Sequence, residues 1–192
     1  MRISAGTAKG RPTASQRLLK RTSDGERLRP TSSKVREAIF DILRNRIEGA
    51  GFVDLYAGTG TVGLEALSRG AASAVFVEPD EFRVSTITGN LSRFGFEHSA
   101  VVIKGKAEEF LARAAERNER YDIFFVDPPY SSEECEKIVP MIDKMGLLND
   151  DGIVIIEHFF KKKFPEMIGS LKIQKCYRYG DTMLSLYRKV RT

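Results

Sequence analysis

A glycine-rich stretch at residues 53–63 combines features that could bind a nucleotide cofactor. An apolar run typical of a buried strand leads into it, and a helical pattern follows it. Gly58 and Gly60 permit backbone angles and a close ligand approach that a Cβ atom would obstruct, and Gly63 allows the helix to pack tightly on the strand. Glu78 ends the next apolar run, 20 residues after Gly58, where a carboxylate can accept hydrogen bonds from both hydroxyls of a ribose. The spacing therefore predicts a cofactor loop.

The loop fits more than one cofactor, because its G-x-G-x-x-G spacing is also that of a nicotinamide-dinucleotide site. Asp54, at the end of the strand, favours S-adenosylmethionine, since its carboxylate would help to hold the cationic ammonium end of that molecule, directly or through water. After the sheet closes, no second domain remains to carry a hydride acceptor. We therefore expect S-adenosylmethionine to be bound by Asp54, Tyr56, Ala57, Gly58, Thr59, Gly60 and Glu78.

A second motif, Asp127-Pro128-Pro129-Tyr130, directly follows the apolar run 121–126. Ligands of open α/β sheets bind at the carboxyl ends of the strands, so Asp127 should face the glycine loop. The consecutive prolines hold an extended turn that leaves the carbonyl of Pro128 free to accept a hydrogen bond. That carbonyl and the Asp127 carboxylate match the two N–H donors of an exocyclic amine, and Tyr130 can stack on the base. The motif predicts a catalytic site for an amino group of a nucleic-acid base.

Both motifs depend on an alternation of short apolar runs with amphipathic segments, which is typical of a parallel sheet flanked by helices. The runs are almost continuously apolar, as strands buried on both faces must be. The expected parallel strands are residues 52–55, 74–77, 101–103, 123–126 and 153–156. The expected helices between them are residues 62–69, 81–94, 107–117 and 132–145, the last interrupted by Pro140.

The two ends of the chain complete a doubly wound α/β fold with a mostly parallel, Rossmann-like sheet of seven strands. Residues 172–179 and 182–189 predict an antiparallel hairpin at the edge of the sheet. Residues 33–47 predict a helix capped by Thr31 or Ser32, and residues 1–30 could form a short β-hairpin or remain mobile. We therefore expect an N-terminal extension, residues 1–48, and a cofactor-binding domain, residues 49–192.

Charge is unevenly distributed along the 192 residues. Residues 1–46 hold 12 Lys and Arg against 4 Asp and Glu, a net charge of +8, whereas residues 47–192 hold 19 against 22, a net charge of −3. Such a basic segment is expected of a protein that meets phosphates. Two cysteines, two histidines and no C-x-x-C do not supply a zinc-ligand cluster with the usual spacings, so we expect no metal. Without a signal peptide or a membrane-spanning run, the expected location is the cytoplasm.

Together these residues resemble class I S-adenosylmethionine-dependent methyltransferases that modify amino nitrogens of bases. The chain is most similar to the bacterial family that methylates guanine N2 in small-subunit ribosomal RNA. The matching segments are residues 1–6, 9–11, 29–32, 35–38, 63–71, 127–130 and 179–182. The resemblance implies RNA binding by the N-terminal hairpin and helix, and an Arg-Pro-Thr turn, ending at Thr31, near the methionine end of the cofactor. We further expect a ribosomal RNA partner, as naked RNA or within a small-subunit assembly particle, and a monomeric enzyme.

We expect the phosphate-contacting residues to be Lys9, Arg11, Arg17, Lys20, Arg29 and Arg36. In one place the chain departs from the family pattern, because Lys106 stands where the family often has an aspartate that contacts the adenine amino group. Adenine recognition would then rest on backbone groups near Ala107 or on Glu108.

Three other functions compete with this interpretation. A DNA adenine-N6 methyltransferase uses a similar Asp-Pro-Pro-Tyr, but normally needs a larger target-recognition region than residues 1–50 provide. A nicotinamide-dependent oxidoreductase would retain a dinucleotide instead of S-adenosylmethionine. A non-enzymatic RNA-binding module would explain the basic segment but not residues 127–130.

Overall fold

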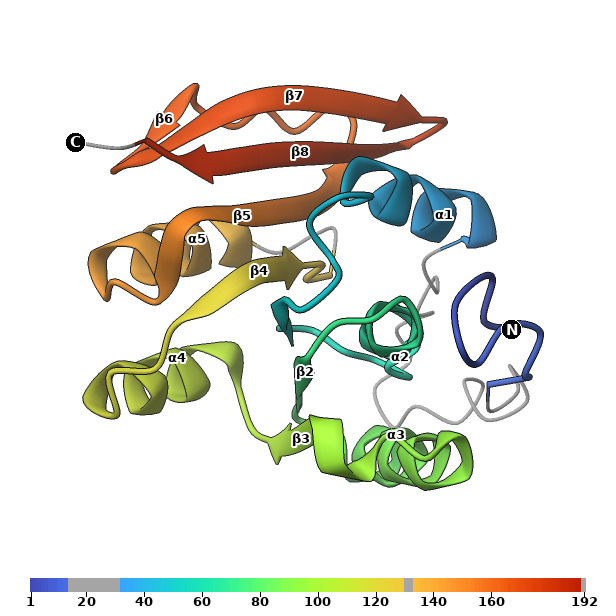
Figure 1. The fold of residues 1–192 in the computed structure, drawn as a ribbon. Helices are drawn as coiled ribbons and strands as arrows, with labels where there is room; N and C mark the ends of the chain where they lie inside the picture. Colours follow the sequence, from blue (N-terminus) through green and yellow to red (C-terminus); the bar gives the residue numbers. More distant parts are fainter. Residues whose placement is uncertain (14–31, 130–132, 191–192) are drawn as a thin grey trace.

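The computed structural model, which describes residues 1–13, 32–129 and 133–190, has a mixed sheet in the order β3-β2-β1-β4-β5-β8-β7-β6 (Figure 1). The five parallel strands are β1 (Gly51–Asp54), β2 (Ser73–Glu78), β3 (Ala100–Lys104), β4 (Tyr121–Val126) and β5 (Leu148–Phe159). Three antiparallel strands follow, β8 (Thr182–Lys189), β7 (Leu171–Tyr179) and β6 (Met167–Ile168). The predicted doubly wound, mostly parallel sheet is confirmed.

The predicted number of strands is too low by one, because the sheet has eight. The additional strand is β6, which pairs with β7 through two residues only. A two-residue strand is too short to show the alternation of apolar and polar side chains on which the prediction depends.

Helices cover both faces of the sheet (Figure 1). One face carries α1 (Ser33–Ile42), α2 (Thr61–Ser68) and α3 (Glu81–Phe94), whose apolar side chains share a core with residues 1–13. The other face carries α4 (Ala107–Glu116) and α5 (Glu134–Lys144), which pack on a second core. A short 3-10 helix, Glu97–Ser99, precedes β3. Within the described part of the chain, no helix is long and apolar enough to cross a membrane.

Helix α1 confirms the predicted helix but ends five residues early. Ser32 is its N-cap, since the Ser32 hydroxyl accepts a hydrogen bond from the backbone N–H of Val35 at 3.2 Å. Leu43 and Ile47 follow the helix in a turn and are still buried. The apolar pattern therefore continued past the helix because the turn keeps the same side of the chain against the core.

Residues 1–13 form a narrow antiparallel loop with a bridge between Arg2 and Pro12, and the remainder of the segment for which a hairpin is predicted, residues 14–30, lies outside the described residues. The loop is anchored on the last turn of α2. The backbone N–H of Ala8 donates to the Ser68 hydroxyl at 2.9 Å, and that hydroxyl donates to the carbonyl of Ala5 at 2.6 Å. Gly6 has a φ of +78°, and a Cβ atom there would lie 1.7 Å from the Ser68 carbonyl oxygen. Only glycine fits this contact.

Candidate active site

The site lies where the order of the strands reverses, because β1 is flanked by β2 on one side and by β4 on the other. Parallel pairing places Asp54, the last residue of β1, opposite Phe76 of β2 and Phe125 of β4. The loops that follow β1 and β4 therefore emerge next to each other at the carboxyl edge of the sheet.

The glycines of the β1–α2 loop have the conformations that the sequence predicts. Gly58 and Gly60 have φ values of +55° and +73°. A Cβ atom at Gly60 would lie 2.9 Å from Ile87, and one at Gly63 would lie 2.3 Å from the ring of Phe76. The loop is therefore a tight backbone turn, and the helix behind it approaches β2 too closely for any larger residue.

Glu78 ties this loop to the start of α3. Its Oε2 accepts a hydrogen bond from the Gly58 N–H at 2.8 Å, and its Oε1 accepts from the Asp80 N–H at 3.0 Å and from Arg83 Nη1 at 3.3 Å. Burial raises the pKa of Glu78, and these two N–H groups and the Arg83 charge oppose that rise. Because a carboxylate offers about four acceptor positions and three are used, about one remains for a further hydroxyl donor.

Asp54 lies beneath the loop and is only 1% exposed. Its Oδ2 accepts a hydrogen bond from the backbone N–H of Gly63 at 3.1 Å, which braces the first turn of α2. Burial raises the pKa of Asp54 from 3.8 to about 7, the Gly63 hydrogen bond lowers it, and the Glu78 charge raises it further. This burial favours the water-mediated form of the predicted contact with an ammonium group.

The rest of the loop combines a fixed base with an accessible tip. The N–H of Ala57 donates to the Val77 carbonyl at 3.0 Å, which attaches the loop to β2. Gly58 and Thr59 are half-exposed and can be reached by a ligand. The Tyr56 hydroxyl is buried and makes no hydrogen bond of normal geometry to the residues that the structure describes. Its burial, with the nearby Glu134 carboxylate, raises its pKa.

The Asp-Pro-Pro motif follows β4 at the same edge, two residues beyond the pairing of Phe125 with Asp54. Asp127 is half-buried, Pro128 is buried and Pro129 is exposed. Tyr130 lies outside the described residues, as do Arg17, Lys20, Arg29 and Thr31. The structure therefore brings the carboxylate-bearing end of β4 beside the glycine loop, and the predicted contributions of those five residues stay predictions.

The start of α4 supplies the third side of the site. Ala107 is its first residue and is buried, and Lys106 makes no side-chain capping bond. Glu108 is engaged in an ion pair with Lys137, whose Nζ lies 2.6 Å from Oε1. Since the first N–H groups of a helix lack partners within it, the geometry favours backbone groups over Glu108 as the polar contacts here.

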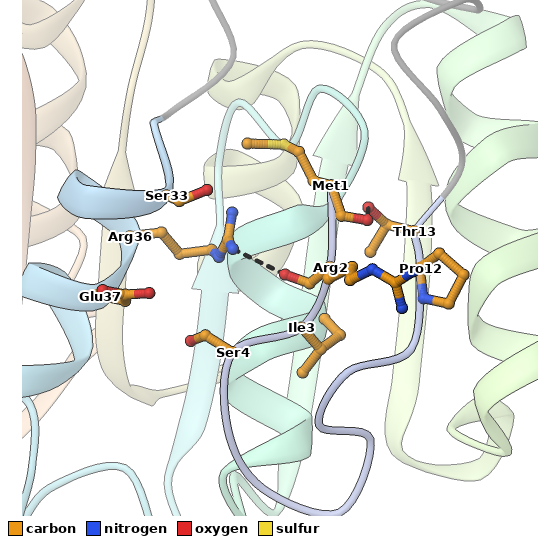
Figure 2. A pocket seen from close by; sticks show the side chains of 9 residues that line it. All are labelled: Met1, Arg2, Ile3, Ser4, Pro12, Thr13, Ser33, Arg36 and Glu37. Atoms are coloured by element: carbon orange, nitrogen blue, oxygen red, sulfur yellow. Dashed lines mark hydrogen bonds between the residues drawn. The ribbon is translucent and has the colours of Figure 1, made fainter.

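Arg36 departs from its predicted role as an RNA contact. Its side chain is 2% exposed, its Nη2 donates to the Arg2 carbonyl at 2.8 Å, and its Nε lies 3.5 Å from Glu65 Oε2 (Figure 2). Glu65 is itself fully buried and also accepts from the N–H groups of Ser4 and Ala5. Arg36 therefore holds the N-terminal loop onto α1 and α2 and is removed from the surface that could meet RNA.

A cavity of about 680 Å³ lies beside Arg36, between the N-terminal loop and the start of α1 (Figure 2). Its lining residues are Met1, Arg2, Ile3, Ser4, Pro12, Thr13, Ser33, Arg36 and Glu37, none of which belongs to the glycine loop or to the Asp-Pro-Pro motif. The two other predicted RNA contacts in the described chain, Lys9 and Arg11, are exposed, and Arg11 also lies over the ring of Phe94 at 5.3 Å.

Sequence analysis missed one group of candidate residues at this edge. Residues 159–164 span the end of β5 and the segment after it and have the sequence Phe-Phe-Lys-Lys-Lys-Phe. Arg178 of β7 lies over the ring of Phe160 at 3.9 Å. The run of residues 159–164 could have been noticed in the sequence, but its place beside Asp127 depends on the pairing of β4 with β5.

Comparisons with known proteins agree with this arrangement. The family model described as Conserved hypothetical protein 95 matches residues 1–188. The chain is 34% identical to YlbH of Bacillus subtilis (strain 168) over 189 residues, which are 98% of this chain and 99% of that protein. It is 31% identical to the Ribosomal RNA small subunit methyltransferase D of Escherichia coli (strain K12) over 166 residues, which are 86% of this chain and 82% of that protein.

A solved structure supports the same assignment. The yhhF protein of Escherichia coli superposes with a TM-score of 0.84 at 26% identity, covering 100% of this chain and 99% of that chain. The match of the family model, over residues 1–188, includes the N-terminal loop, the glycine loop and the Asp-Pro-Pro motif. The chain therefore belongs to the Conserved hypothetical protein 95 family, the family of the Ribosomal RNA small subunit methyltransferase D proteins.

Proposed function

We propose that the protein transfers a methyl group from S-adenosylmethionine to the exocyclic N2 nitrogen of a guanine in small-subunit ribosomal RNA. The observation that carries the proposal is the pairing of β1 with β4, which brings Asp127 and Pro128 beside the glycine loop. The name of the Escherichia coli relative, at 31% identity, supports ribosomal RNA as the substrate. The resemblance to the guanine-N2 family supports guanine over adenine.

The residues around the glycine loop fit S-adenosylmethionine. Glu78 retains about one acceptor position for a ribose hydroxyl, and the buried Tyr56 hydroxyl is a polar group that the described chain leaves without a normal hydrogen bond. Backbone groups at Ala107 would contact the adenine, and Asp54 would act on the ammonium group through water. When bound, the sulfonium of this molecule supplies the electrophilic methyl group.

The contribution of the chain to methyl transfer is to bind and orient the amine. The N2 nitrogen of guanine is conjugated with the ring and is a poor nucleophile. Hydrogen bonds from its two N–H groups to the Asp127 carboxylate and the Pro128 carbonyl would favour a more pyramidal nitrogen with an available lone pair. The same carboxylate would stabilise the positive charge that develops on the nitrogen as its bond to carbon forms. Stacking on Tyr130 would offset part of the cost of removing the base from its helix.

The test of this proposal is a methylation assay with the purified protein, S-adenosylmethionine and small-subunit ribosomal RNA from a strain that lacks the gene. Nucleoside analysis by mass spectrometry should find N2-methylguanosine, and the Asp127→Asn variant should form far less of it. A product of N6-methyladenosine would instead indicate an adenine methyltransferase. Binding of NAD in place of S-adenosylmethionine, measured by calorimetry, would contradict the assignment of the cofactor.

The proposal includes a monomeric enzyme that acts in the cytoplasm on RNA within a small-subunit assembly particle. The same assay run on naked RNA and on isolated particles distinguishes the two forms of substrate. Light scattering of the purified protein checks the oligomeric state.

A further inference from the structure

The carboxyl edge of the sheet holds a cluster of aromatic and basic side chains next to the Asp-Pro-Pro motif. In the pairing of β4 with β5, Val126 lies opposite Ile156, so Phe159 stands three residues beyond that pair, as Pro129 does on β4. The antiparallel pairing of β5 with β8 places Thr182 opposite Phe159. The turn between β7 and β8 therefore lies at the same edge of the sheet as the carboxyl end of β5 (Figure 1).

Main-chain and ring contacts hold this cluster in place. The N–H of Phe160 donates to the Asp181 carbonyl at 2.9 Å, which fastens the segment after β5 to the turn between β7 and β8. The rings of Phe159 and Phe160 pack edge to face with centroids 4.9 Å apart. The guanidinium of Arg178 lies 3.9 Å from the centroid of Phe160. Both rings are half-buried, so each keeps part of its surface toward solvent.

The basic side chains of this cluster differ in what they contact. Lys162 forms an ion pair with Glu136 at 2.9 Å, so its charge is balanced. Lys161, Lys163 and Arg178 are exposed and form no ion pair within the described part of the chain. The Lys161 ammonium lies 6.0 Å and 5.9 Å from the ring centroids of Phe159 and Phe160. The turn also carries one acidic side chain, the exposed Asp181.

We infer that this cluster, defined as Phe159, Phe160, Lys161, Lys163 and Arg178, is an RNA-binding surface that holds an unpaired stretch of the substrate beside the target base. Uncompensated positive charge that surrounds partly exposed aromatic rings is the combination that binds single strands, because cations contact phosphates while bases stack on rings. A target base that leaves its helix has unpaired neighbours, and this surface adjoins the residues that would receive that base. The inference rests on the proposed function for the identity of the substrate.

The N-terminal segment alone would not explain such binding, because the two surfaces lie on different elements. Residues 1–13 pack against α2 on one face of the sheet, whereas the cluster lies on β5 and β7 beyond β4. RNA held at both would cross the edge of the sheet that carries the glycine loop and Asp127. Residues 47–192, although their net charge is −3, would then contribute a basic RNA contact of their own next to Asp127.

The charged part is tested with the double variant Lys161→Ser and Lys163→Ser, and with a matched control, Arg120→Ser and Lys144→Ser. Arg120 and Lys144 are also exposed, but they precede β4 and β5 at the opposite edge of the sheet. The probe is a fluorescently labelled transcript of small-subunit ribosomal RNA, titrated over a series of salt concentrations. The double variant should bind more weakly, and its plot of log affinity against log salt should be flatter by about 1.4, or about 0.7 for each lost phosphate contact on a single strand.

The aromatic part is tested by placing tryptophan in a chain that has none. The tryptophan fluorescence of the Phe160→Trp variant should be quenched when the same RNA saturates the protein, because a base stacks on the indole. Tyr121→Trp is the control, since Tyr121 is also half-buried but begins β4 at the opposite edge. Affinity for S-adenosylmethionine and the thermal midpoint should be unchanged in all four variants.

Two results would overturn the inference and leave the proposed function standing: a lysine double variant whose RNA affinity equals that of its control, or a Phe160→Trp fluorescence that RNA does not change while the protein still methylates it. Failure of the unaltered protein to bind or methylate ribosomal RNA would overturn the proposed function and this surface together.

Discussion

The protonation of Asp54 should make the stability of the protein fall as the pH rises toward neutrality. Burial raises the pKa of this carboxyl to about 7 in the folded protein, whereas its ordinary value is 3.8. Between these two values the unfolded chain has lost the proton and the folded chain retains it. The free energy of unfolding must therefore decrease with pH across this interval, and the contribution is constant above about pH 7.

The magnitude follows from the width of the interval. Each pH unit between the two pKa values changes the free energy of unfolding by at most about 1.4 kcal/mol. From pH 5 to pH 7 the loss caused by Asp54 is then about 2 kcal/mol. The Asp54→Asn variant should lack it, because an amide oxygen can still accept the hydrogen bond from Gly63 but does not titrate.

The assay is urea unfolding at pH 5, 6 and 7 for the unaltered protein, for Asp54→Asn and for the control Asp150→Asn. Asp150 is 81% exposed and therefore controls for the replacement of an aspartate by asparagine at the surface. Glu78, whose pKa burial also raises, contributes a slope of the same sign and is present in all three proteins. Parallel profiles for the unaltered protein and Asp54→Asn over this range would refute the reasoning.

The other predictions concern catalysis, cofactor binding and packing. Asp127→Ala should lower the rate of methyl transfer at saturating substrates by at least about 100-fold, while the dissociation constant of S-adenosylmethionine changes by only a few-fold. Glu78→Ala should weaken the binding of S-adenosylmethionine by about 1 to 3 kcal/mol in calorimetric titration. An unchanged dissociation constant would show that this residue does not bind the ribose. Gly63→Ala should destabilise the fold by about 1 to 3 kcal/mol in urea unfolding, since the new methyl group would meet the ring of Phe76 at 2.3 Å. The smaller Phe76→Leu side chain should recover part of that loss if the clash is its cause.

The central sheet could be predicted from sequence because buried parallel strands leave a strong local signal. β1, β2 and β4 are almost continuously apolar, and an acidic residue ends or directly follows each of them: Asp54, Glu78 and Asp127. Both the strands and their carboxyl ends can therefore be recognised in the sequence. The glycine loop is also predictable from local sequence, because Gly58 and Gly60 have positive φ values, which glycine adopts more readily than any other residue.

Features that depend on distant partners were not predictable in the same way. Nothing around Arg36 shows that it turns inward, because its burial depends on Glu65, which belongs to a different helix, and on the backbone of Arg2. A charged side chain in a basic segment is expected to be solvated, and only a buried carboxylate in the right place reverses that expectation. The early end of α1 has a similar origin, because the turn that follows it is fixed by the entry into β1.

The net charge of a long segment hides where its unpaired charges lie in the fold. Residues 47–192 carry a net charge of −3, which directs attention to the N-terminal segment as the region that meets phosphates. In the fold, Lys162 is paired with Glu136 and Glu108 with Lys137. Lys161 and Lys163, by contrast, are exposed and form no ion pair with any residue that the structure describes. Phosphates respond to the field within about 10 Å, so the arrangement of paired and unpaired charges decides where RNA can bind. A segment with a negative net charge can therefore still present basic side chains at the carboxyl ends of β4 and β5. The order of the strands, not the composition, determines where these side chains gather.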